Sequence, residues 1–174
     1  MERALHIVVL DRSSVGEDVS VEPLKKYGEV TFHMTTKDEE AAERVKDADI
    51  IIVNKTPMNA DTLDGASHLK LICEFATGFD NVDLDYCRKR GIPVVNVVNY
   101  STAAVAQHTI ACVLYILEKL RYYDDYVKSG AYGSQPRFSH FGLPYSELDG
   151  KTWGIVGMGN IGRKVAAIAE AFGC

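Results

Sequence analysis

The sequence predicts an α/β protein with a doubly wound parallel sheet, for three reasons. Five short apolar segments rich in β-branched residues follow one another over the first hundred positions. Helix-like segments of about ten to fifteen residues separate most of them. Strands as apolar as these are typical of parallel sheets covered on both faces.

The individual elements can be placed along the chain. Strands are expected at 5–10, 29–33, 48–54, 69–76 and 92–97. The intervening helices are expected at 21–28, 37–48 and 81–91, the last closed by Gly91. With right-handed crossovers, these elements give a flavodoxin-like domain over residues 1–99.

Composition and charge limit the classes of function. The chain has 174 residues, 47% of them hydrophobic, and a net charge of -5 without clusters. This balance argues against nucleic acid or an anionic membrane as partner. Apolar runs are too short for a secretory signal or a membrane span, so we expect a cytoplasmic protein. The four cysteines are scattered and are expected to be free thiols, and the histidines lack metal-ligand spacing, so no metal is expected.

A different pattern begins at residue 99. Ser101 or Thr102 can cap a helix that continues without Gly or Pro to about Ser129. Apolar residues cover most of its circumference, which predicts burial between two bodies. Residues 130–150 are rich in Gly, Pro, Ser and aromatics and are too long for a tight connection. We therefore expect 100–150 to form a crossover helix and an arm that lies on a second subunit of a homodimer.

The last segment, 151–174, reads as a strand, a glycine turn and a helix. Gly157, Gly159 and Gly162 match the dinucleotide fingerprint, in which the glycines permit a tight turn, close approach of a pyrophosphate and close helix–strand packing. The pattern alone also occurs without a nucleotide. The acidic residue that distinguishes NAD from NADP would lie about 20 residues further on, beyond Cys174.

A second candidate site follows the fourth strand. Residues 76–83 read ATGFDNVD and lie at the carboxyl end of the sheet, where open α/β sheets bind ligands. Gly78 can adopt angles that turn successive N–H groups toward one anion. The alternative is a plain turn in which Asp80 or Asn81 caps the next helix. Lys55, after the third strand, would attract the same anion or simply be solvated.

Gln107 and His108 lie on the predicted long helix. No Ser/His/Asp arrangement accompanies them, so we expect His108 to be a helix-packing residue.

The run NKTPMNADTLDGASHLKLICEFATGFDNVDLDYCRKRGIPVVNVVNYSTAAVAQHTIACVLYIL, residues 54–117, resembles the D-isomer-specific 2-hydroxyacid dehydrogenases. The segments ATGFDNVD and especially YSTAAVAQHT resemble the glycerate dehydrogenase (hydroxypyruvate reductase) branch. FSHFGLPYSELDGKTWGIVGMGNIG looks like the approach to the cofactor domain of that family.

The resemblance implies an NAD(P)-dependent reductase of a small 2-oxo acid, with NAD favoured, working as a dimer. By it, the backbone of Thr77, Gly78 and Phe79 holds the substrate carboxylate. Val105 faces the nicotinamide, and Asn160 with Ile161 lies at the pyrophosphate.

The same resemblance puts the catalytic arginine, glutamate and histidine beyond Cys174. We therefore expect 151–174 to be the start of a truncated cofactor domain, and the chain to be an inactive fragment whose last strand lacks neighbours.

Two other functions compete with this interpretation. One is a dehydrogenase-like scaffold that senses nucleotide or binds partners, as corepressors related to the family do. The other is a phosphoacceptor domain, which would need paired acids after the first strand. Only Asp11 stands there, so the sequence disfavours it.

Overall fold

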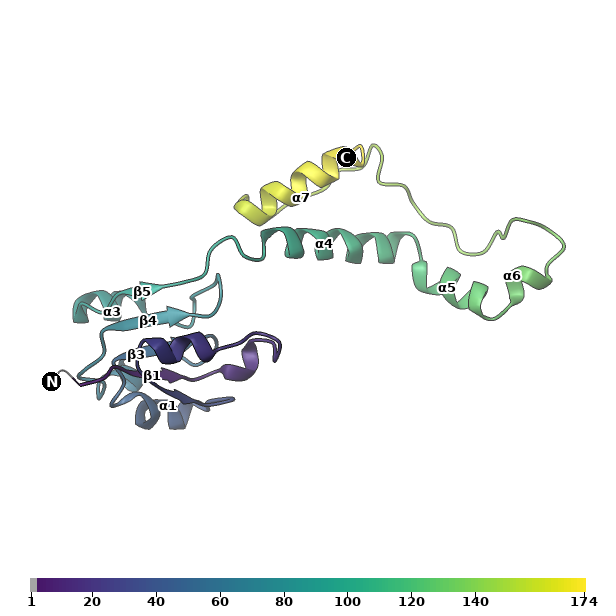
Figure 1. Cartoon of the computed structure of the whole chain (residues 1–174). Coiled ribbons are helices and arrows are strands. Elements are labelled where there is room, and N and C mark those ends of the chain that lie inside the picture. The colour runs from purple at the N-terminus through teal and green to yellow at the C-terminus, as the bar shows by residue number, and fades with distance from the viewer. Residues whose placement is uncertain (1–2) are drawn as a thin grey trace. The chain divides into compact units, whose positions relative to one another are not determined.

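The computed structural model describes residues 3–174 and divides the chain into two compact units, Met1–Val98 and Asn99–Cys174. We call them unit 1 and unit 2. Figure 1 shows unit 1 from purple to teal and unit 2 from teal-green to yellow.

Unit 1 is built on a five-stranded parallel sheet. Its strands are β1 (His6–Val9), β2 (Glu29–Phe32), β3 (Ile50–Val53), β4 (Leu71–Glu74) and β5 (Val94–Val95). The order is β2-β1-β3-β4-β5, and every neighbouring pair is parallel. This order is that of a flavodoxin-like fold, so the predicted fold class is confirmed.

The helices of unit 1 agree with the sequence in place and differ in extent. They are η1 (Arg12–Ser14), η2 (Glu22–Lys26), α1 (Asp38–Val45), α2 (Ala60–Leu63) and α3 (Leu84–Arg90). The segment predicted as a helix at 21–28 is only the 3-10 helix η2, in which Pro23 stands in the first turn. Gly91 ends α3 with a φ of 68°, as its place after the last helical residue predicts.

The two faces of the sheet are covered unequally. On one face, Val45 of α1, Leu63 of α2 and Cys87 of α3 pack on the buried strand residues Ile51 and Ile72. On the other face, the smaller cluster of Ile7, Val9 and Ile52 is joined by Leu24 of η2. The expectation that both faces are covered holds, and the α-helices all contribute to one of them.

Unit 2 contains α4 (Thr102–Leu117), α5 (Leu120–Lys128), α6 (Ala131–Ser134) and α7 (Asn160–Ala171). The prediction of one uninterrupted helix to Ser129 is wrong. Lys119 adopts a left-handed φ of 53°, and α5 leaves α4 at a bend of 66°. Between residues 3 and 174 no single helix is long and apolar enough to cross a membrane.

The core of unit 2 lies between α4 and α7, which run side by side in Figure 1. Ala106, Ile110 and Val165 are buried there, with Trp153 and Ile161 packed against them. In α4 only Ala106 and Ile110 are buried. The prediction that this whole helix is buried is therefore not met, because its remaining apolar side chains stay partly or fully exposed.

The arm after α6 is held to α5 by an aromatic cluster. The His140 ring stacks on Tyr126 with centroids 3.7 Å apart, and its Nε2 lies 2.9 Å from the Tyr122 hydroxyl. The Tyr123 hydroxyl donates to the Leu143 carbonyl at 2.6 Å. The predicted irregular segment 130–150 is thus ordered by side chains of the preceding helix.

Residues 151–156 do not form the predicted strand. No ladder pairs them with any part of residues 3–174, and the Val156 side chain is fully exposed. A strand is defined by inter-strand hydrogen bonds, so an apolar β-branched segment without a neighbour stays irregular.

Candidate functional site

Asp11 organises the carboxyl end of the sheet in unit 1. Its carboxylate is 7% exposed, and Oδ2 accepts the backbone N–H groups of Asn54 (2.9 Å), Lys55 (3.0 Å) and Thr56 (3.3 Å). Oδ1 accepts the Thr56 hydroxyl at 3.0 Å. Burial would raise the pKa of Asp11, but these donors bring it below the ordinary value of 3.8. The carboxylate therefore stays ionised and fixes the segment that carries the exposed side chain of Lys55.

The predicted substrate segment, 77–79, follows β4. Within the described chain the backbone N–H groups of Thr77, Gly78 and Phe79 donate to no acceptor. The Thr77 carbonyl accepts the Asn96 side-chain amide at 2.7 Å, and the Thr77 hydroxyl donates to the Val97 carbonyl at 2.9 Å. The segment is thus braced from the end of β5 while three of its donors remain available.

Two details of this segment differ from the predictions. Gly78 does not use the left-handed region, since its φ is not positive, and a Cβ there would meet only Asp80 Oδ1 at 3.3 Å. The residue that caps α3 is Asp83, whose side chain accepts the Tyr86 N–H at 2.9 Å, and neither Asp80 nor Asn81 does so. The simple capping alternative for Asp80 and Asn81 is therefore wrong.

Asn81 instead joins the Lys55 segment to the 77–79 segment. Its side-chain amide donates to the Thr56 carbonyl at 3.2 Å and to Glu74 Oε2 at 3.4 Å. Its carbonyl accepts the Met58 N–H at 2.8 Å, beside a parallel bridge between Met58 and Val82. The residue after Lys55 is thus hydrogen-bonded to the turn that follows residues 77–79.

The glycine turn in unit 2 has the geometry that each glycine predicts. Gly157 has a φ of 97°, and Gly159 is the N-cap of α7. No atom lies within 4 Å of a Cβ built on Gly159, so this backbone is open to a ligand. A Cβ on Gly162 would clash with the Gly157 carbonyl oxygen, so only glycine fits there. The turn fits the pyrophosphate of a dinucleotide at a helix N-terminus.

Of the other predicted cofactor residues, Asn160 and Ile161 lie within this turn and Val105 lies on α4. The Asn160 side chain is hydrogen-bonded to Asn99 and to Arg163. Ile161 packs its side chain into the core of unit 2, so only its backbone is available to a ligand. Val105 is 41% exposed on α4. His108, expected to pack, is exposed instead, with its Nε2 3.5 Å from the Cys112 thiol.

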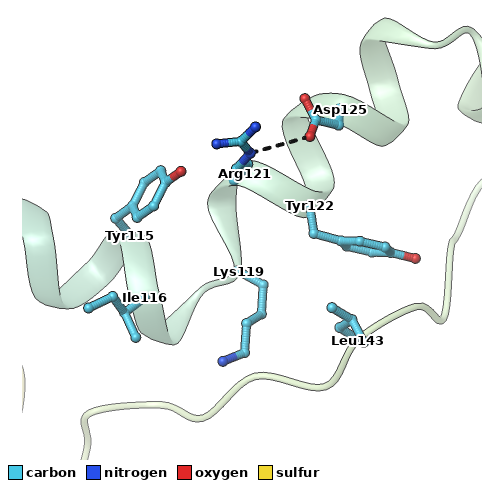
Figure 2. A pocket seen from close by; sticks show the side chains of 7 residues that line it. All are labelled: Tyr115, Ile116, Lys119, Arg121, Tyr122, Asp125 and Leu143. Atoms are coloured by element: carbon cyan, nitrogen blue, oxygen red, sulfur yellow. Dashed lines mark ion pairs between the residues drawn. The ribbon is translucent and has the colours of Figure 1, made fainter.

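A further hollow lies where α4, α5 and the arm meet in unit 2. Figure 2 shows its lining, which combines aromatic, aliphatic and charged side chains: Tyr115, Ile116, Lys119, Arg121, Tyr122, Asp125 and Leu143. The Arg121 and Asp125 side chains form an ion pair at 3.7 Å. Over residues 3–174, no group of three or more His, Cys, Asp or Glu side chains is arranged to hold a metal ion.

Comparison with known proteins decides the family. The profile of the D-isomer specific 2-hydroxyacid dehydrogenases, catalytic domain, matches residues 7–171. The chain belongs to this family. It is 36% identical over 173 residues to a hydroxypyruvate reductase of Blautia hydrogenotrophica, and 36% identical over 170 residues to a glycerate dehydrogenase of Methylorubrum extorquens. These matches cover 97% and 96% of the chain but only 54% and 53% of the two relatives.

Solved structures match nearly the whole chain, covering 97% of it in two cases. A D-lactate dehydrogenase of Aquifex aeolicus, complexed with NAD and lactic acid, is 33% identical with a TM-score of 0.77. An acyclic imino acid reductase in complex with NADPH and D-Arg is 29% identical with a TM-score of 0.80. The chain covers 49% and 54% of those structures, and so spans about half the length of the relatives it matches.

Three residues that the sequence analysis did not assign to the site support it. Asn96 braces Thr77, and Glu74 lies beneath Asn81. A signal for Glu74 was present, since a lone acidic residue interrupts the apolar segment 69–76 and so predicts a buried carboxyl group. The sequence points to Asp11 only as a single acid where a phosphoacceptor domain would need two. Its carboxylate instead accepts the backbone N–H groups of Asn54 and Lys55.

Proposed function

We propose that this chain provides the substrate-binding domain and the first turn of the cofactor site of an NAD(P)-dependent reductase of small 2-oxo acids. The observation that carries the proposal is the set of three backbone N–H groups at 77–79, at the carboxyl end of β4, which find no acceptor among residues 3–174. A carboxylate accepts several such donors well, because hydrogen bonds to an ionised acceptor are about twice as strong as neutral ones.

The residues of the proposed substrate site have different roles in binding. The N–H groups of Thr77, Gly78 and Phe79 grip the carboxylate, and Lys55 adds positive charge from the neighbouring strand end. Phe79, 44% exposed, gives the site an apolar wall. Such a clamp orients the 2-oxo carbon, and holding the substrate in one geometry lowers the barrier to reaction.

The cofactor site is proposed at Gly157, Gly159, Asn160, Ile161 and Gly162, with Val105 facing the nicotinamide. The open backbone at Gly159 and the N-terminus of α7 suit the pyrophosphate of NAD or NADP. When bound, the nicotinamide would supply the hydride. The catalytic arginine, glutamate and histidine are expected outside these 174 residues, so we infer that the chain alone does not turn over.

Anion binding can be tested on the chain as it exists. Glyoxylate titrated into the ¹⁵N-labelled protein should shift the amide signals of 77–79, and hydroxyacetone, which lacks the carboxylate, should not. Lys55→Met should weaken glyoxylate binding severalfold, whereas the control Lys89→Met on the exposed end of α3 should not. Shifts confined to other residues would contradict the proposed anion site. Reduction of hydroxypyruvate by the chain alone would contradict the inference that the chain alone is inactive.

We further infer a homodimer formed through residues 100–150. Exposed apolar side chains gather on α4, α5 and the arm, among them Tyr115, Ile116, Phe138 and Phe141. Exposed apolar surface of this kind marks association sites. Light scattering should give the mass of two chains, and Ile116→Glu should halve it. A monomeric wild-type protein would refute this part.

A further inference from the structure

Glu74 is a buried carboxyl group close to the proposed substrate segment. It is the last residue of β4, lies opposite Val53 of β3 and is 1% exposed. Its side chain is on the same face of the sheet as Ile72, which belongs to the main core of unit 1. Burial of an ionised carboxylate is costly unless a cation or several donors accompany it.

The partners of Glu74 do not suffice for a negative charge. Oε2 accepts one long hydrogen bond, from the Asn81 amide at 3.4 Å. Oε1 is buried and finds no partner anywhere in residues 3–174. No ion pair of the described chain involves Glu74. These surroundings suit a neutral carboxylic acid.

The charges around Glu74 act in both directions. Burial is the largest effect and raises the pKa of Glu74 from the ordinary 4.5 to about 7. The hydrogen bond from Asn81 and the positive charge of Lys55 lower this pKa, whereas the negative charges of Asp11 and Asp80 raise it. The group thus changes its charge close to neutral pH, as histidine ordinarily does.

Asn81 connects Glu74 to the site. The same amide group that contacts Glu74 also donates to the Thr56 carbonyl at 3.2 Å, next to Lys55. The Asn81 backbone carbonyl accepts a hydrogen bond from the Met58 N–H, and Asn81 lies two residues after Phe79. A movement of the Glu74 carboxyl group therefore moves Asn81, which connects the Lys55 segment to the 77–79 segment.

We propose that Glu74 is a positioning residue, which in its protonated form leaves the Asn81 amide on the Thr56 carbonyl and so keeps the 77–79 segment in its anion-binding form. This inference rests on the proposed function of that segment. When the proton leaves, an ionised carboxylate is buried without a cation beside Asp11 and Asp80. The charge attracts the Asn81 amide, which donates more strongly to a carboxylate than to a carboxylic acid, and the Lys55 ammonium. Either movement weakens the contact between Asn81 and Thr56 and reduces the fraction of molecules able to grip a carboxylate.

The sign of the pH dependence follows from linkage. The pKa of Glu74 is higher in the folded chain than in the unfolded chain. Its contribution to stability is therefore complete below pH 4.5 and is lost as the pH rises through about 7. Glyoxylate affinity should fall over the upper part of the same range.

The test follows Glu74 directly by the ¹³C shift of its carboxyl carbon, together with the amide signals of 77–82 and glyoxylate binding. In the wild-type chain, both sets of signals should titrate with a midpoint near 7. Glyoxylate should bind about threefold or more weakly at about pH 8.5 than at about pH 6. Glu74→Gln, a permanently neutral side chain of the same shape, should abolish this dependence and keep the tighter binding. The exposed Glu29→Gln is the matched control and should behave as wild type.

Two results would overturn the proposal: a Glu74 midpoint near 4.5, or amide signals of 77–82 that do not follow Glu74. The wild-type titration decides this even if Glu74→Gln fails to fold. If glyoxylate fails to bind at any pH while the 77–82 signals follow Glu74, the proposed function fails and the positioning of the segment by Glu74 is upheld.

Discussion

Replacing Asp11 by Asn tests whether one carboxylate holds the segment after β3. The carboxylate accepts three backbone N–H groups, from Asn54, Lys55 and Thr56, and one hydroxyl. Asn keeps the shape and one acceptor but removes the charge. A hydrogen bond to a charged group contributes about 1 kcal/mol more than a neutral one, so the free energy of unfolding should fall by about 3 kcal/mol for the three backbone bonds. Asp11→Ala, which leaves the donors without any acceptor, should cost more.

The assay must resolve the two units. Trp153, the single tryptophan, lies in unit 2, so its fluorescence serves as an internal control. Urea unfolding of unit 1 is followed by hydrogen exchange of the β1 and β3 amides. Asp11 has a pKa below 3.8 in the folded chain, so its stabilisation is present above that pH and is lost as the pH falls through the folded-state value. The deficit of Asp11→Asn should therefore shrink in acid, and the exposed Asp18→Asn should show no deficit. Equal stability of Asp11→Asn and wild type at neutral pH would refute the reasoning.

Three further substitutions test other parts of the structure. Gly162→Ala puts a Cβ against the Gly157 carbonyl, so it should raise hydrogen exchange in the first turn of α7 and destabilise unit 2 by about 1–3 kcal/mol; unchanged exchange would contradict the close packing. Asn96→Ala removes the 2.7 Å bond to the Thr77 carbonyl and should cost about 1 kcal/mol in urea unfolding while weakening glyoxylate binding. Leu63→Ala empties a fully buried position and should cost about 2–5 kcal/mol without changing the binding measured on folded protein; a change in affinity would show that the core and the site are coupled.

Most of unit 1 could be predicted because its signals are local. Apolar β-branched runs place all five strands, and right-handed crossovers limit the ways in which they can be arranged in one parallel sheet. Gly91 marks the end of α3 for a reason confined to one residue, its positive φ. The short helix α2 was missed, although Asn59 before it is a typical N-cap whose side chain accepts the Thr62 N–H at 3.2 Å.

The errors concern features that depend on distant partners. Lys119 adopts a left-handed conformation although it is neither Gly nor Asn, the residues that usually do so, and the bend between α4 and α5 could therefore not be predicted. Residues 151–156 have the composition of a strand, but a strand also needs a neighbour. In the site, Lys55 and the 77–79 segment could be predicted from the strand ends that carry them. The link through Asn81 and Glu74 could not, because it depends on which side chain of a turn points inward.

The position of Asp11 has a consequence for selectivity. In a sheet ordered 2-1-3-4-5, chain connections leave β1 and β3 in opposite directions, and the crevice between their carboxyl ends commonly receives a phosphate group. Here the chain's own carboxylate occupies that crevice and saturates its amides. An incoming dianion would meet fixed negative charge there, whereas the site that we propose for small monoanionic acids lies one strand further along, after β4.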